Sequence, residues 1–125
     1  METSWQVLVV DDDDDQLSTL RRGLLYLGHS SVDARTAGEA LALLTDGSTR
    51  IDLVIIDLSR AGKPGAALVA HVARVRPALV LTGLAGAADV IALGVPLLAK
   101  PFTPEELGNA IRKAMTPHDG KKEDK

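Results

Sequence analysis

The chain has 125 residues and no cysteine, so it has neither a disulfide framework nor a thiolate metal site. It contains one Trp, one Tyr and one Phe, and the core must therefore be built from aliphatic side chains. No apolar run approaches the roughly 20 residues that cross a bilayer, and no signal peptide is recognisable. With a net charge of −3 and no large basic block, direct binding to nucleic acid is not expected. We therefore expect a single cytoplasmic domain that is not inserted in a membrane.

Short apolar runs are the main structural signal of this sequence. They are rich in Val, Leu and Ile and do not alternate with polar residues, which is typical of strands covered on both faces. Four such runs occupy residues 7–10, 53–56, 79–81 and 95–98, and a fifth, weaker strand is expected over residues 31–34. Pro96 predicts that the last of these strands lies at an edge of the sheet.

Helical patterns separate the strands. Leucines recur at helical spacing up to Gly28, and a Thr36–Glu39 capping box precedes a second helix. A third apolar stripe, formed by Leu68, Val72 and Val75, stops before Pro77. The clearest helix follows Thr103, with a proline at its first position and a glutamate that closes the box. We expect a short helix over residues 86–93 and a disordered polar tail over residues 117–125.

Strand and helix alternate five times, which predicts a parallel sheet with helices on both faces. The fold expected at this length is a flavodoxin-like (βα)5 three-layer sandwich with strand order 2-1-3-4-5, formed by residues 1–116. Such folds bind ligands at the carboxyl ends of the strands, where the winding reverses between strands 1 and 3.

The predicted carboxyl ends carry polar side chains. Strand 1 leads into residues 11–15, all aspartates, and strand 3 ends at Asp57. Strand 4 ends at Thr82-Gly83 and strand 5 near Lys100. Clustered carboxylates repel each other unless a cation is present, and Mg²⁺ suits carboxylate and phosphate oxygens. A carboxylate can also attack phosphorus and form an aspartyl phosphate, while an ammonium, a hydroxyl and a glycine backbone accommodate the phosphoryl group.

In sequence order, these segments resemble the response-regulator receiver domains, the family that includes the chemotaxis response regulator. The resemblance covers about residues 7–115 and implies a role in two-component signalling or a phosphorelay, fed by a histidine kinase or a phosphotransfer protein. The matching segments are Val9-Val10-Asp11-Asp12, residues 52–57, Gly65, Leu81-Thr82-Gly83 and Lys100-Pro101-Phe102.

The resemblance implies a role for each of these residues. Asp57 is the expected phosphoacceptor, and Asp11 and Asp12 are expected to hold Mg²⁺ together with Asp57 and the main-chain carbonyl of Ser59. The same resemblance assigns contacts with the phosphoryl group to Thr82 and Lys100. Such a protein is a signalling phosphoacceptor that promotes its own phosphorylation and dephosphorylation, and it is not otherwise an enzyme.

Departures from the family pattern affect the expected output surface. Arg60 and Ala61 stand where the family usually has Met-Pro, and Leu97 replaces an aromatic switch residue. The stretch between Thr82 and Lys100 is short, which trims the fourth helix. We expect the chemistry to be intact and the strand-5 switch to be muted.

Two other functions fit parts of the pattern. Asp11 and Asp13 after a buried strand also resemble the signature of haloacid-dehalogenase-like phosphatases, with Asp11 as nucleophile and Asp13 as acid/base. That hypothesis leaves Asp57 and Lys100 without a role. The second alternative is a receiver fold that docks partners without being phosphorylated. In either receiver hypothesis, Asp13, Asp14 and Asp15 lead into the first helix, where negative charge is favourable.

Overall fold

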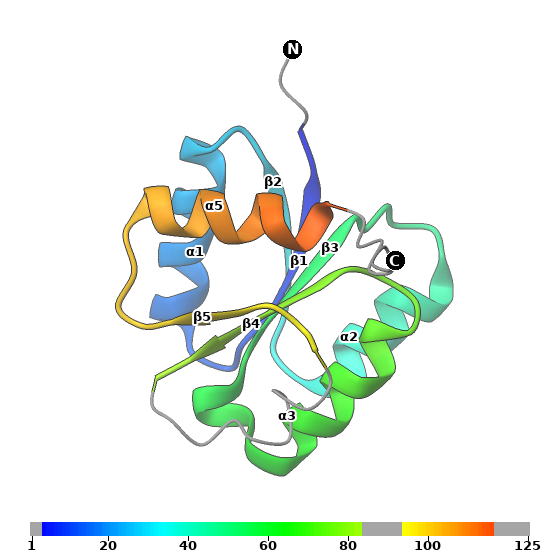
Figure 1. Cartoon of the computed structure of the whole chain (residues 1–125). Helices are drawn as coiled ribbons and strands as arrows, with labels where there is room; N and C mark the ends of the chain where they lie inside the picture. The colour runs from blue at the N-terminus through cyan, green and yellow to red at the C-terminus, as the bar shows by residue number, and fades with distance from the viewer. Residues whose placement is uncertain (1–3, 84–93, 117–125) are drawn as a thin grey trace, which may run out of the picture.

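The computed structural model describes residues 4–83 and 94–116, without the side chains of residues 59–65. Its five parallel strands form one sheet in the order β2-β1-β3-β4-β5, which confirms the predicted flavodoxin-like topology (Figure 1). The strands are β1 (Gln6–Val10), β2 (Ser30–Ala34), β3 (Leu53–Asp57), β4 (Ala78–Thr82) and β5 (Leu97–Ala99). The described helices are α1 (Asp14–Tyr26), α2 (Ala37–Asp46), α3 (Leu58–Ala73) and α5 (Pro104–Met115).

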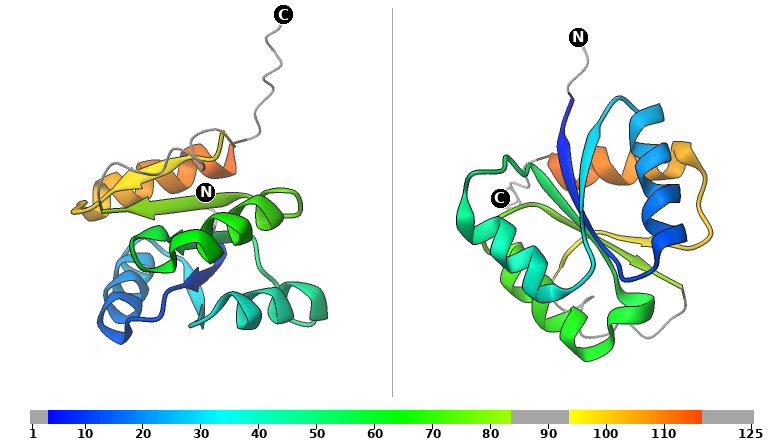
Figure 2. Two further views of the ribbon diagram at one scale, coloured as in Figure 1. Left: turned by 90° about the horizontal axis from the view of Figure 1, so that it is seen from below. Right: turned by 180° about the vertical axis from the view of Figure 1, so that it is seen from behind.

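The helices cover both faces of the sheet. Helices α1 and α5 pack on one face, and α2 and α3 pack on the other (Figures 1 and 2). Successive residues of a strand point to opposite faces, so Val7 and Val9 contact the α1/α5 layer while Leu8 and Val10 contact the α2/α3 layer. Because both faces are covered, the central strands need apolar residues at every position, as the sequence has them.

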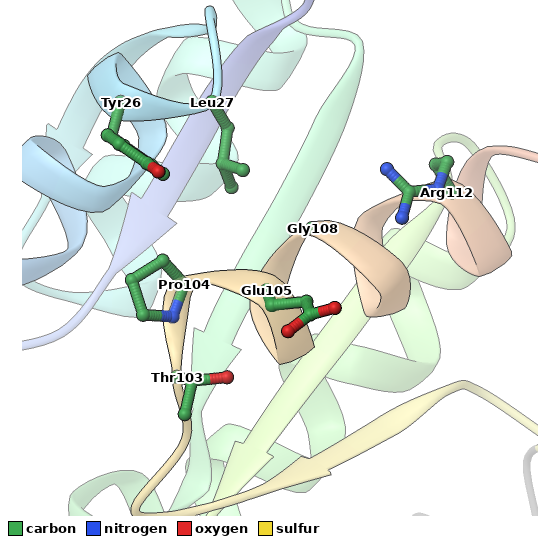
Figure 3. A pocket seen from close by; sticks show the side chains of 7 residues that line it. All are labelled: Tyr26, Leu27, Thr103, Pro104, Glu105, Gly108 and Arg112. Carbon is green, nitrogen blue, oxygen red and sulfur yellow. The ribbon is translucent and has the colours of Figure 1, made fainter.

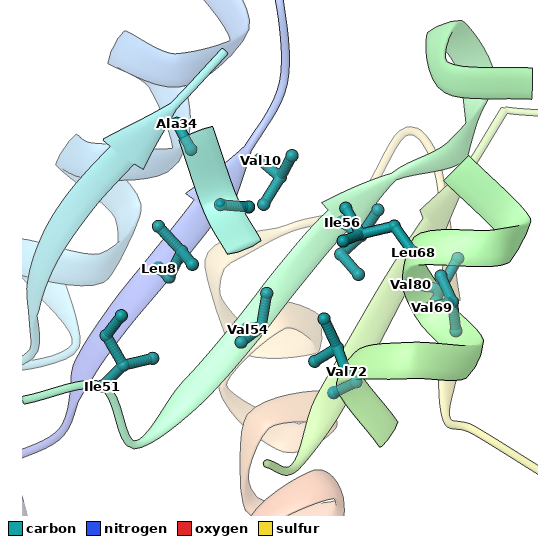
Figure 4. Close-up of a cluster of buried hydrophobic side chains, with 12 residues drawn as sticks. Leu8, Val10, Ala34, Ile51, Val54, Ile56, Leu68, Val69, Val72 and Val80 are labelled. Atoms are coloured by element: carbon teal, nitrogen blue, oxygen red, sulfur yellow. The ribbon is translucent and has the colours of Figure 1, made fainter. Parts of the chain in front are cut away.

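Two aliphatic cores follow from this alternation. The core on the α2/α3 face joins β1, β2, β3 and β4 to both helices, and Figure 4 shows its side chains. Its buried members are Leu8, Val10, Ala34, Ala40, Ile51, Val54, Ile56, Leu68, Val69, Val72, Ala78 and Val80. The buried members of the α1/α5 core are Val7, Val9, Leu17, Leu20, Leu24, Leu53, Ile55, Leu79, Leu81, Leu107 and Ile111. No aromatic side chain is fully buried in either core, as the composition predicts.

Capping residues fix where the helices begin. The predicted box at α5 is complete, because the Thr103 hydroxyl accepts the Glu106 N–H while the Glu106 carboxylate accepts the Thr103 N–H. At α2 the Thr36 hydroxyl accepts the Glu39 N–H, but the Glu39 side chain accepts from the N–H of Arg35 instead of Thr36. The second box therefore closes one residue earlier than the sequence pattern predicts.

Two expectations need correction. Helix α3 ends at Ala73, and Val75, predicted to lie on its apolar stripe, is 49% exposed. Strand β5 begins at Leu97, and its leucines are only half-buried because an edge strand is paired on one side alone. The edge position itself agrees with the prediction made from Pro96. The helix expected over residues 86–93 and the tail expected over residues 117–125 lie outside the described residues.

Helix α3 starts directly after β3, so Asp57 is the last strand residue and Leu58 the first helical one. Within residues 4–83 and 94–116, no helix is long and apolar enough to cross a membrane.

Two adjacent leucines of α1 test the assignment of its buried face. Leu24 is fully buried in the α1/α5 core, whereas Leu25 is 63% exposed. We expect Leu24→Ala to lower the free energy of unfolding by roughly 2–5 kcal/mol, because it removes buried methyl groups and leaves a cavity. Leu25→Ala should change it by no more than about 0.5 kcal/mol. Urea denaturation measures both, and equal losses would contradict the assigned orientation of α1.

Candidate functional site

The carboxyl edge of the sheet brings together side chains from four strands. Asp11 follows β1, Asp57 ends β3, Thr82 ends β4 and Lys100 follows β5. Parity decides which face each one takes. Asp11 continues the series of Val7 and Val9, and Asp57 continues that of Leu53 and Ile55, so both carboxylates point to the α1/α5 face.

Asp11 and Asp57 lie next to each other on neighbouring strands. Val10 pairs with Ile56 in the register of β1 and β3, and the two aspartates come one residue later on each strand. Their exposed fractions are 4% and 2%, and no other charged side chain is buried in the part of the chain that the structure describes. The fold therefore holds two carboxylates together in a site largely closed to water.

Two donors converge on one oxygen of Asp57. Lys100 Nζ lies 2.7 Å from Asp57 Oδ2 and forms an ion pair with it, and Gln16 Nε2 donates to the same oxygen at 3.1 Å. The backbone of Lys100 is held as well, because its N–H donates to the Thr82 carbonyl at 2.9 Å. The Lys100 side chain is 22% exposed, so its charge is only partly screened by solvent.

Asp11 is less well satisfied. Its Oδ1 accepts the N–H of Asp13 at 3.0 Å, while its Oδ2 is buried and has no hydrogen-bond donor. Burial, followed by the interaction with Asp57, raises the pKa of the Asp11 carboxyl to about 7, against the opposing effects of the Asp13 N–H and the Lys100 ammonium. A protonated Asp11 can donate a hydrogen bond to Asp57. Protonation therefore explains how Asp11 lies beside the Asp57 carboxylate although no donor reaches its Oδ2.

A divalent cation fits this pair of carboxylates. Binding of a cation would replace the proton, because it removes the repulsion and gives the orphaned Asp11 oxygen a partner. Asp12, the other residue expected to bind metal, is exposed beside the pair. No group of three or more His, Cys, Asp or Glu side chains in the described residues could hold a metal alone. Water or phosphate oxygens would have to complete the coordination, as is usual for Mg²⁺.

The remaining aspartates start the first helix. Asp13 is the N-cap of α1 and its side chain accepts the N–H groups of Asp15 and Gln16, while Asp14 pairs with Arg35. This agrees with the prediction that these residues lead into the helix. An Asp13 engaged as a cap is poorly placed to act as a general acid, which counts against the phosphatase hypothesis.

The other expected site residues lie at the same edge. Thr82 and Gly83 are half-buried at the end of β4, and Ser59 lies in the first turn of α3. Leu97, in place of the expected aromatic residue, packs half-buried against the α2/α3 core.

Gln16 is a residue of this site that the sequence reasoning missed. It lies one turn into α1, beyond the five aspartates, and no motif distinguishes it. The available signal was its position one residue before the buried Leu17, which orients it toward the strand ends.

A separate cavity of about 530 Å³ lies between the end of α1 and the first turns of α5 (Figure 3). Tyr26 and Leu27 line one side, and Pro104, Gly108 and Arg112 line the other. None of the residues expected to bind metal or a phosphoryl group lines it.

Comparisons with known proteins point to one family, although no protein-family model matches the chain. The uncharacterized transcriptional regulatory protein YrkP of Bacillus subtilis (strain 168) is 32% identical over 110 residues. That match covers 83% of this chain and 46% of YrkP, so the chain spans about half the length of that relative.

Solved receiver domains resemble the whole fold. The signal receiver domain of an HD domain-containing protein from Pseudomonas fluorescens Pf-5 is 30% identical, with a TM-score of 0.77 over 90% of this chain and 95% of that one. A response regulator receiver domain from Clostridium thermocellum is 26% identical, with a TM-score of 0.78 over 94% and 97% of the two chains.

The raised pKa of Asp11 predicts how stability depends on pH without metal. The folded protein binds the Asp11 proton more tightly than the unfolded chain does, because the pKa of this carboxyl in the unfolded chain is near 3.8. The resulting stabilisation is complete below about pH 4 and is lost as pH rises through 7. In chelator, the free energy of unfolding of wild type should therefore fall by roughly 2–4 kcal/mol between these pH limits, relative to that of Asp11→Asn, whose side chain cannot titrate.

Urea denaturation at a series of pH values measures this difference. Asp12→Asn is the matched control, because Asp12 is exposed and its variant should follow wild type. Parallel profiles for wild type and Asp11→Asn would contradict the proposed carboxylate pair.

Proposed function

The chain belongs to the response-regulator receiver-domain family, and from this premise we propose that it accepts a phosphoryl group on Asp57 with Mg²⁺ bound beside it. Receiver domains are signalling proteins, and the chain therefore has a role in two-component signalling. The assignment of residues 1–116 to the receiver domain and of residues 117–125 to a tail is part of the same proposal.

One observation carries the proposal. Asp57 is 2% exposed at the end of β3, with the Lys100 ammonium 2.7 Å from its Oδ2 and the Asp11 carboxyl beside it. A buried carboxylate with a cation already in contact is expensive to maintain for stability alone. The same arrangement suits an acceptor for a phosphoryl group, since the attacking oxygen and the neutralising charge are both in place.

The reaction requires little covalent chemistry from the protein. An oxygen of Asp57 forms a bond to phosphorus while the bond from phosphorus to the donor's leaving atom breaks. When the donor is a phosphorylated histidine, the imidazole nitrogen keeps the electron pair and takes up a proton. Lys100 neutralises charge on the phosphoryl oxygens, and Thr82 and Gly83 provide a hydroxyl and an open backbone at the adjoining strand end.

Asp11, Asp12 and Asp57, with the main-chain carbonyl of Ser59, are the residues that would hold Mg²⁺. The bound ion would supply positive charge for the oxygens of the phosphoryl group. The unpartnered Oδ2 of Asp11 and its position beside Asp57 support this assignment.

The expected donor is a histidine kinase or a phosphotransfer protein. The phosphatase alternative would make Asp11 the nucleophile, yet burial raises the pKa of Asp11 to about 7, and a protonated carboxyl is a poor nucleophile. The interaction-module alternative leaves the buried pair of Asp57 and Lys100 without a chemical role.

Covalent labelling tests the acceptor directly. Acetyl phosphate with Mg²⁺ should add one phosphoryl group, which peptide mass spectrometry should locate on Asp57. Asp57→Ala should abolish the labelling, because no other buried carboxylate among the described residues forms an ion pair with an ammonium. Asp15→Ala is the matched control, since Asp15 is an exposed carboxylate of α1 and should leave the labelling unchanged.

Two outcomes would contradict this assignment. A phosphoryl group on Asp11 would favour the phosphatase-like chemistry. An unmodified protein, under conditions in which another receiver domain is labelled, would favour an interaction module that is not phosphorylated.

Metal binding is a separate test. Mg²⁺ should raise the thermal unfolding midpoint of wild type by mass action, because it binds the folded site. Asp11→Asn and Asp12→Ala should each weaken Mg²⁺ binding by at least about tenfold in isothermal titration calorimetry, because each removes a charged ligand. Asp14→Asn should bind as wild type does, and equal binding by all four proteins would place the ion elsewhere.

A further inference from the structure

We propose that Gln16 is a positioning residue that orients the Asp57 carboxylate for phosphoryl acceptance, an inference that rests on the function proposed above. Its Nε2 donates to Asp57 Oδ2 at 3.1 Å. The same oxygen accepts from Lys100 Nζ at 2.7 Å, so two donors from different parts of the fold meet on one atom.

The start of α1 holds Gln16 in place. The Asp13 side chain caps the helix by accepting the N–H groups of Asp15 at 2.9 Å and Gln16 at 3.4 Å. The next residue, Leu17, is 2% exposed and anchors this turn in the α1/α5 core. The cap before Gln16 and the buried Leu17 after it hold the backbone in place, and the half-buried Gln16 side chain extends to the end of β3.

The orientation of Asp57 is a real variable, because the terminal torsion of an aspartate has broad, roughly two-fold preferences. A single donor on Oδ2 would still let the carboxylate plane turn about that contact. A second donor, arriving from α1 while Lys100 arrives from the end of β5, fixes the plane. Alignment of the attacking oxygen with phosphorus controls the rate of such a transfer.

The carboxamide is suited to this task. An ionised carboxylate only accepts hydrogen bonds, so the amide nitrogen of Gln16 must face it. The carboxamide adds no charge, and it therefore orients Asp57 without competing with the cations that neutralise the phosphoryl oxygens. No bond of Gln16 forms or breaks in the transfer. It acts on the rate only through Asp57.

Substitutions at position 16 separate hydrogen bonding from packing. Gln16→Met keeps the length and the helix propensity but removes the donor. Gln16→Glu keeps the shape but replaces the donor with a negative charge. We expect phosphorylation by phosphoramidate to be roughly tenfold slower in Gln16→Met than in wild type, and slower still in Gln16→Glu. A role in packing alone would instead leave the isosteric Gln16→Glu closest to wild type.

Thr19→Met is the matched control. Thr19 is exposed on the same helix, so the substitution should leave both the rate and the thermal midpoint unchanged. The thermal midpoint of Gln16→Met should lie close to that of wild type, which separates a slower reaction from a less stable fold.

Side-chain amide resonances give an independent readout. The chain has three carboxamide side chains, those of Gln6, Gln16 and Asn109. Gln6 donates to the Arg50 carbonyl and Asn109 accepts from Arg112, both away from Asp57. In a proton–nitrogen correlation spectrum, Asp57→Ala should shift the side-chain NH₂ signals of Gln16 and leave those of Gln6 and Asn109 in place.

The outcomes distinguish this inference from the function on which it rests. If wild type is not phosphorylated on Asp57, the proposed function fails and the inference fails with it. If wild type is phosphorylated and Gln16→Met reacts at the same rate, only the inference is overturned. An unshifted Gln16 amide in Asp57→Ala would also overturn it, because the contact would then be absent in solution.

Discussion

The repulsion between Asp11 and Asp57 is the constraint on which the carboxyl edge of this sheet depends. Two neighbouring strands end in carboxylates of the same parity, and the α1/α5 layer closes over both. Burial strengthens the interaction between charges, so the pair requires a compensating positive charge. The Lys100 ammonium provides part of this positive charge at Asp57. Without a metal ion, the Asp11 carboxyl, whose pKa is raised to about 7, holds a proton at lower pH and then carries no negative charge.

Local contacts at the start of α1 and at the end of β5 arrange side chains around this pair. Asp13 caps α1 one turn before Leu17 enters the core, which brings Gln16 over the strand ends and turns Asp14 outward to Arg35. After β5, the Lys100 N–H donates to the Thr82 carbonyl, so the ammonium approaches Asp57 from a backbone that is held in place. The chemistry proposed for Asp57 therefore depends on the register of the sheet and on one helix cap, more than on any long-range arrangement.

Much of this could be predicted from the sequence, because parallel strands leave a strong signature. The continuous apolar runs located four of the five strands, and the rule that ligands bind at the carboxyl ends selected Asp11, Asp57, Thr82 and Lys100. The alternation of side chains between the two faces of a strand was not applied to the aspartates. It divides the aspartates into a buried one at Asp11 and an exposed one at Asp12, which the motif alone treats as an equal pair. Gln16 was missed because no motif marks it and its contact with Asp57 is made by a side chain that crosses between elements. Val75 was misassigned because α3 ends two residues earlier than its apolar spacing implies.

We propose that the Asp11–Asp57 pair forms a cation-dependent site for a phosphoryl group. Beryllofluoride imitates such a group on a carboxylate, and its bound form can be followed by fluorine NMR. Bound fluorine signals should appear only when Mg²⁺ is present. They should be lost in both Asp57→Asn and Asp11→Asn. Bound signals that persist in chelator, or that survive in Asp57→Asn, would contradict this proposal.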